Sequence, residues 1–260
     1  MSDLVATLHF RAGIGGEPII TSAQATDGYS FEPASWGARL SGPAVETPGT
    51  RSISVDVGVG TCAEIRSSGV SQAAAGCSST SFSVVVESDA MLTWRLAPGV
   101  AAGGCDHLTD GTVQLAASAR LLWVDEISFD PEDPGTLRSR LRVTRDGWPV
   151  ACRELALGPG SPLWESPAVL SGAAALSVLT VVDPGRPMSR WRPQRAGVDG
   201  AAGVAMPLSV PGAQIVAWGQ DLAACRGVVE DLFVAGMPGW AEARWRVAGG
   251  LAATFEPTPL

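Results

Sequence analysis

The sequence predicts a mainly β protein, a β-superhelix of strands stacked as in a solenoid, with one or two short α-helices. The main observation is an apolar cassette, Val-x-Val-x-x-x-Ala-x-Leu-x-Trp, which recurs at an interval of 29 residues. In addition, 31 Gly and 19 Pro are spread along the chain, as many turns between short strands require. A hydrophobic fraction of 46% over 260 residues is enough for a substantial core.

Each copy of the cassette is two stretches of period 2 around a short turn, so each predicts strand, turn and strand. One weaker and two strong copies share this spacing. They are Val55, Val57, Thr61, Ala63 and Ile65; Val84, Val86, Ala90, Leu92 and Trp94; and Val113, Leu115, Ala119, Leu121 and Trp123.

The elements outside the cassettes follow from local patterns. Residues 1–50 predict edge strands and loops. Residues 137–145 alternate apolar side chains with arginines, which predicts a strand with one buried face. Asp146-Gly147 then turns this strand into a partner around Val150 and Leu155.

The C-terminal third carries a loop signal and a helix signal. Residues 191–203 are polar and rich in glycine, and we expect a mobile loop there. From Leu222 to Phe233 an apolar stripe at helical spacing follows Asp221, a suitable N-cap. We expect residues 255–260 to be a frayed tail and residues 1–260 to form a single domain.

The charged residues exclude several classes of function. All 18 basic residues are arginines, so lysine Schiff bases and the lysine of a phosphate-binding loop are absent. The net charge of −8 offers no broad attraction to nucleic acid.

Other patterns argue against a membrane protein and an enzyme. We expect a cytoplasmic protein, because no apolar run reaches the length of a membrane span and the first residues lack a signal-peptide pattern. Five scattered cysteines argue against a disulfide framework, and two histidines against a multi-histidine metal centre. No Gly-x-Ser-x-Gly motif accompanies them, so we expect neither catalysis nor a tightly bound cofactor.

Cys105, Asp106 and His107 form the first candidate site, because thiolate and imidazole suit a borderline metal such as nickel or zinc. Adjacent residues of an extended strand point to opposite faces, so three in a row rarely complete a coordination sphere. A transient metal contact and a turn with a partly buried histidine both remain open.

The second candidate is an acidic run with no basic residue inside it, which contains Asp125, Glu126 and Asp133. The prolines at 131 and 134 favour a solvated turn. The alternatives are a path for cations and a surface for a basic partner.

Taken in order, several segments after residue 51 resemble the urease accessory protein UreD, also called UreH, in its short actinobacterial form. The resembling segments are residues 89–94, 101–107, 113–115, 119–123, 134–143, 167–172 and 222–233. Residues 47–51 and 129–133 depart from the glycine-rich elements usual in that family, which indicates a divergent member.

The resemblance implies a β-superhelix that acts as a non-catalytic chaperone. Its implied partners are UreF, UreG through UreF, and apo-urease, and nickel passes through or along it in transit. Two alternatives from other classes are a secreted-type β-solenoid enzyme acting on carbohydrate and a generic β-solenoid interaction scaffold.

Overall fold

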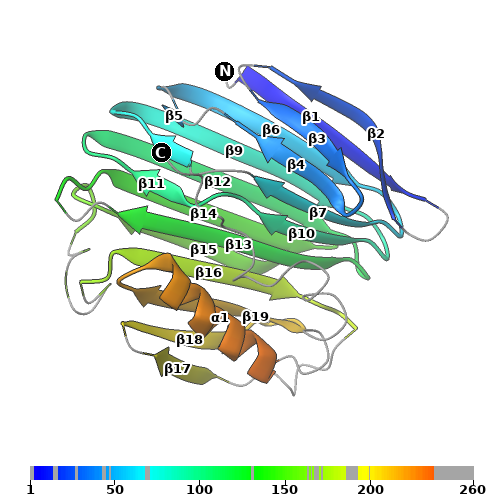
Figure 1. Ribbon diagram of the computed structural model, residues 1–260. Helices are drawn as coiled ribbons and strands as arrows, with labels where there is room; N and C mark the ends of the chain where they lie inside the picture. The colour runs from blue at the N-terminus through cyan, green and yellow to red at the C-terminus, as the bar shows by residue number, and fades with distance from the viewer. Residues whose placement is uncertain are drawn as a thin grey trace.

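The computed structural model shows a β-solenoid of about three coils with one α-helix packed on its side (Figure 1). This confirms the fold class that the sequence predicts. The structure describes residues 3–13, 17–26, 29–42, 45–46, 48–67, 71–129, 132–162, 164, 166, 170, 172–185, 193–198 and 200–236.

The strands, in chain order, are β1 (Asp3–Ala12), β2 (Pro18–Ala25), β3 (Ser30–Ala34), β4 (Gly37–Ser41), β5 (Val45–Glu46), β6 (Gly49–Val57), β7 (Cys62–Ser67), β8 (Ser71–Ala73), β9 (Gly76–Val86), β10 (Met91–Arg95), β11 (Gly99–Ala101), β12 (Cys105–Leu115), β13 (Arg120–Phe129), β14 (Thr136–Arg145), β15 (Trp148–Leu157), β16 (Ala175–Val182), β17 (Gln194–Val198), β18 (Ala201–Pro207) and β19 (Gly212–Gly219). The helix is α1 (Leu222–Gly236).

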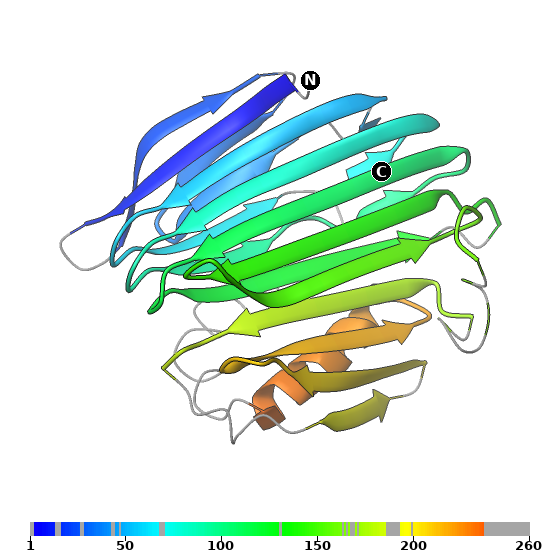
Figure 2. The same cartoon turned by 180° about the vertical axis from the view of Figure 1, so that it is seen from behind.

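The strands form two sheets that face each other. The first has seven strands in the order β15-β14-β12-β9-β6-β1-β2. The second has twelve, with the main order β17-β18-β19-β16-β13-β10-β7-β4-β3 and with β5, β8 and β11 off this path. Figure 2 shows the long strands of the first sheet in front, with helix α1 behind the second sheet.

Each 29-residue repeat of the sequence forms one coil of the solenoid. Neighbouring strands pair in parallel, with Val55 opposite Val84 and Val84 opposite Val113 in the first sheet. In the second sheet Trp94 pairs with Trp123 in the same way. A step of 29 residues therefore moves each side chain to the equivalent place in the next coil, and every cassette position is buried.

The arginine-faced strand and its turn are confirmed. Strands β14 and β15 are antiparallel, and residues 137, 139, 141 and 143 of β14 are buried. Asp146 and Gly147 have φ angles of 50° and 79°, the positive values that a tight hairpin turn needs.

Helix α1 begins as the sequence predicts. The Asp221 Oδ1 atom accepts a hydrogen bond from the backbone N–H of Ala224 at 2.8 Å, which caps the helix. The buried face of the helix packs on β16, β18 and β19 and forms a second core there.

The prediction of a mobile loop at residues 191–203 is wrong for the part of this range that the structure describes. Residues 194–198 form β17 and residues 201–207 form β18, an antiparallel pair. Gly203 lies under helix α1, where a Cβ atom would come within 2.6 Å of Val228 Cγ1. The glycine that suggests a loop in the sequence serves close packing instead. The predicted tail at 255–260 lies outside the described residues.

Candidate functional site

Strand β12 separates the three residues of the first candidate site. Cys105 and His107 face the interior with 4% and 7% of their surface exposed. Asp106, between them, points outward with a side chain that is 42% exposed. The pleat of the strand therefore keeps the carboxylate away from the thiol and the imidazole. In the described part of the chain no three His, Cys, Asp or Glu residues gather in a metal-binding group.

His107 has hydroxyl groups at both ring nitrogens. Its Nδ1 atom lies 2.8 Å from Ser78 Oγ on β9, and its Nε2 atom lies 3.3 Å from Thr109 Oγ1. A neutral imidazole donates from one nitrogen and accepts at the other, and a hydroxyl serves either role. The ring is thus held in a fixed orientation inside the solenoid.

The Cys105 thiol is protected against ionisation. Burial raises the pKa of Cys105, and the charge of Asp106 raises it further. Its Sγ atom lies 3.7 Å from the Thr136 carbonyl oxygen, to which it donates a weak hydrogen bond. Because metals bind the thiolate, an ion at this position has to displace the proton first.

Asp106 belongs to a row of ion pairs on the outer face of the first sheet. Its carboxylate accepts hydrogen bonds of 2.8 and 3.0 Å from Arg138 Nη2. Arg142 pairs with Asp110 and Arg140 with Glu154 along the same face. The arginines of β14 therefore meet carboxylates of β12 and β15 across the sheet.

The prediction of a solvated turn is wrong for Asp125 and Glu126, because both lie within strand β13. Asp125 faces the interior and pairs with Arg153 of β15. Glu126 faces the other way and pairs with Arg226 of helix α1. These arginines stand 28 and 100 residues further along the chain, so the acidic run gives no sign of them.

Asp133 lies at the exposed corner of the coil, beside the turn that precedes Cys105. A Cβ atom on Gly103 would clash with the Asp133 carboxylate, and one on Gly135 would clash with Cys105 Sγ. The two candidate segments, about thirty residues apart in sequence, are therefore neighbours in the stack of coils.

A row of polar side chains crosses the interior along the stacking direction. Arg51 of β6 pairs in register with Thr80, Thr80 with Thr109, and Thr109 with Ser139. The row continues from Ser139 to Arg153, whose Nη2 atom donates to Ser139 Oγ at 3.2 Å. We call these five residues, with Ser78, His107 and Asp125, the interior polar row.

The interior polar row has hydrogen-bonding capacity to spare. Among the described residues, the buried Nε and Nη1 atoms of Arg153 have no hydrogen-bond partner, and neither has Nε1 of the buried Trp123. Buried donors of this kind are normally satisfied by another protein group or by ordered water. The row thus offers donors to water or to a small guest in an otherwise apolar interior.

Comparison with known proteins decides the family. The profile of the UreD urease accessory protein matches residues 50–245, three quarters of the chain. The chain belongs to the UreD family. The match begins at β6 and includes the coils, the interior polar row and helix α1.

Three of the UreD proteins that the chain resembles come from Streptomyces species. The urease accessory protein UreD of Streptomyces coelicolor is 37% identical over 150 residues, which are 56% of this chain and 58% of that protein. That of Streptomyces avermitilis is 35% identical over 143 residues, 54% and 56% of the two chains. UreD 3 of Streptomyces griseus is 28% identical over 226 residues, 85% and 76% of the two. The chain spans a little over half the length of the first two relatives.

The family assignment confirms the resemblance seen in the sequence. In the part of the chain that the structure describes, no helix is long and apolar enough to span a membrane.

Proposed function

We propose that this UreD family member is a non-catalytic scaffold for urease maturation. It works as one domain over residues 1–260, in the cytoplasm, in a complex with UreF and, through UreF, UreG. The complex delivers nickel to apo-urease, and no cofactor is held tightly. The family match supports the urease role and gives no support to the alternative of a carbohydrate-active solenoid.

The interior polar row is the observation that carries the nickel part of this proposal. Ni²⁺ accepts nitrogen, oxygen and sulfur ligands, and in the middle of the row, on β12, the His107 imidazole lies beside hydroxyl groups. Cys105, two residues away on the same face of β12, adds a thiol.

The same geometry limits how tightly the ion is held. His107 already has two hydroxyl partners, Cys105 is protonated, and Arg51 places positive charge at one end of the row. Each of these features opposes the retention of a divalent cation. A carrier needs this property, because a complete ligand set would prevent release to urease.

The three acidic residues have different roles in the proposal. Asp125 lies inside and keeps Arg153 neutralised within the row, whereas Glu126 is occupied by Arg226. Asp133, at the exposed corner, is the one available to a partner surface. Asp133→Asn should therefore weaken binding to UreF or urease, with unchanged thermal stability.

The test is a reconstituted activation assay with apo-urease, UreF, UreG, GTP and nickel. Cys105→Ala with His107→Gln should lower activation several-fold and leave the complex with UreF intact in size-exclusion chromatography. Asp106→Asn is the matched control, because this residue lies between the two and points outward. Normal activation by the double variant would show that nickel does not pass the interior polar row.

A further inference from the structure

The first sheet stops short of the second at the C-terminal end of the stack of coils. Beyond β14 and β13 of the last coil, the first sheet adds only β15, whereas the second adds β16, β19, β18 and β17. At roughly 4.8 Å per strand, this difference of three strands leaves about 14 Å of the second sheet without a facing strand. Figure 2 shows no described strand or helix in front of β19, β18 and β17. At the other end of the stack, by contrast, the outermost strands β2 and β3 lie against each other.

The uncovered face of β18 and β19 is apolar. Alternate residues of the two strands face helix α1 and belong to the core beneath it, so the residues between them point the other way. We call these the open face: Ala202, Val204, Met206, Gln214, Val216 and Trp218. An antiparallel sheet with one face in water normally carries polar residues on that face. Gln214 is the only polar residue here, so the residue types indicate a face that another segment covers.

The exposure of the open face rises with distance from β15. In one register row, Val178 of β16 is 1% exposed, whereas its neighbours Val216 of β19 and Val204 of β18 are only partly buried. Met206, also on β18, is 40% exposed. Leu155 of β15 packs on the same core cluster as Val216. The edge of β15 therefore lies beside the open face.

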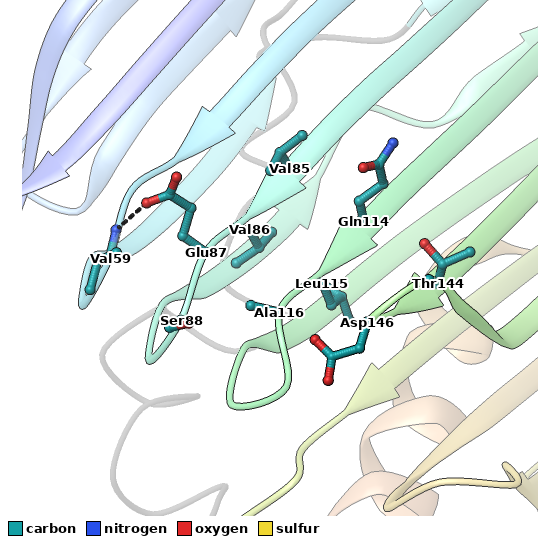
Figure 3. A pocket seen from close by; sticks show the side chains of 11 residues that line it. Val59, Val85, Val86, Glu87, Ser88, Gln114, Leu115, Ala116, Thr144 and Asp146 are labelled. Carbon is teal, nitrogen blue, oxygen red and sulfur yellow. Dashed lines mark hydrogen bonds between the residues drawn. The ribbon is translucent and has the colours of Figure 1, made fainter.

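Strand β15 also ends the stack with an unpaired backbone edge. Earlier coils are joined to the coil that follows, as where the Val59 N–H donates to Glu87 Oε2 of the next turn at 3.1 Å (Figure 3). In the part of the chain that the structure describes, β15 pairs with β14 alone. Its register with β14 is regular over the seven residues from Ala151 to Leu157. This stretch presents backbone N–H and C=O groups that a further strand can use.

We infer that an extended segment of a partner protein adds to the edge of β15 and becomes the next strand of the first sheet. Neighbouring strands lie about 4.8 Å apart and facing sheets about 10 Å apart, so the added strand lies over β19. Its inward side chains, at alternate positions, then cover Val216, Trp218 and Val204. A helix on the open face would leave the edge of β15 unpaired. This interaction surface does not depend on the nickel role.

The outer face of β15 indicates the side chains that fit between the inward ones. The outward side chains of an added strand stand beside Cys152, Glu154 and Ala156, which are exposed. Glu154 is the only charged residue of the three, and its side chain is 57% exposed. Opposite charges on neighbouring strands stabilise a sheet. The segment is therefore about seven residues long, apolar at alternate positions and basic or hydroxyl-bearing between them.

The test titrates the peptide acetyl-Arg-Val-Thr-Val-Arg-Val-Thr-amide into the full chain by calorimetry. Two further forms carry N-methyl groups either on the three valines or on the three residues that follow them. The N–H groups of alternate residues in a strand point to the same side, so only one of these sets can face β15. One methylated form should bind like the parent peptide, and the other should bind at least about tenfold more weakly. Hydrogen exchange should slow at residues 151–157 when the parent peptide binds.

Variants of the protein test the open face. Val204→Ser with Met206→Ser should weaken binding roughly tenfold, because apolar surface is lost beneath the added strand. The matched control is Val198→Ser with Val234→Ser, at valines that are 49% and 43% exposed outside the open face. It should bind like the parent chain. Circular dichroism of both variants checks that the fold is unchanged.

Four outcomes would overturn the inference. The first is no binding of the parent peptide at millimolar concentration. The second is that the two methylated forms bind equally, whether both as well as the parent peptide or both more weakly. The third is equal affinity of the two double variants. The fourth is a concentration-dependent dimer that the Val204–Met206 variant loses, since the occupant would then be a second copy of this chain.

Discussion

Arg226 of helix α1 forms a two-point ion pair with Glu126 of strand β13. The Nε–Oε1 distance is 2.7 Å and the Nη2–Oε2 distance is 2.6 Å. The two side chains are 13% and 5% exposed. The hydrogen bond to Glu126 raises the pKa of Arg226, so the guanidinium stays charged where the helix meets the sheet. The pair fixes the position of the helix on the second sheet.

Glu126→Gln should destabilise the fold by about 3 kcal/mol, because it leaves the Arg226 charge buried without its partner. Asp110→Asn, which breaks the exposed pair with Arg142, should cost less than about 1 kcal/mol. Urea unfolding of both variants measures the difference. Similar midpoints for the two would show that the Glu126–Arg226 pair does not hold the helix.

Cys225 gives the protein a specific weakness in alkali. Burial, followed by the charges of Asp221 and Glu126, raises the pKa of Cys225 to about 12 from an ordinary value of 9.0. The unfolded chain ionises its thiol near the ordinary value, whereas the folded chain does not. The stability that this thiol contributes is therefore complete below pH 9 and is lost as the pH rises toward 12.

The free energy of unfolding should fall by at most about 1.4 kcal/mol per pH unit as the Cys225 thiol ionises in the unfolded chain. Cys225→Ala should remove this contribution, so the two stability curves should converge between pH 8 and pH 10.5. The measurement is chemical denaturation at each pH. Parallel curves would mean that the thiol ionises alike in the folded and unfolded chains.

Substitution by alanine should change the stability of the protein in opposite directions at two glycines near helix α1. At Gly203 the added methyl would meet Val228 Cγ1 at 2.6 Å and the Val216 carbonyl at 2.8 Å. Gly203→Ala should therefore cost about 1–3 kcal/mol. At Gly227, within the helix, nothing lies within 4 Å of the added methyl.

Gly227→Ala should stabilise the protein by about 0.5–1 kcal/mol, because alanine favours the helix. Thermal unfolding of the two variants tests both signs. A neutral Gly203→Ala would contradict the close contact between β18 and the helix.

The stacked tryptophans should dominate the stability of the coils. The rings of Trp94 and Trp123 lie 4.5 Å apart and are tilted by 2°, and both are almost completely buried. Trp94→Ala should destabilise the fold by about 3–5 kcal/mol. Trp148→Ala, at a site that is 77% exposed, should change stability by less than about 0.5 kcal/mol. Guanidinium unfolding followed by circular dichroism compares them, and equal effects would refute the role of the stack.

The sequence by itself determined the coil. The interval of 29 residues and the period of 2 within each strand indicate which side chains face inward. Both periods can be read directly from the order of the residues. The Asp221 cap and the Asp146-Gly147 turn are local for the same reason, and all were predictable.

Only the tertiary structure decided how the polar residues are used. Asp125 meets Arg153 and Glu126 meets Arg226 because β15 and helix α1 pack against β13 from opposite sides, and no local pattern encodes these contacts. Likewise, Gly203 suggests a loop when only the sequence is considered. Its close packing against helix α1 shows why a residue without a side chain stands there. The interior polar row appears only after the coils stack, since a serine or threonine in an alternating strand looks the same whether its face is solvated or covered.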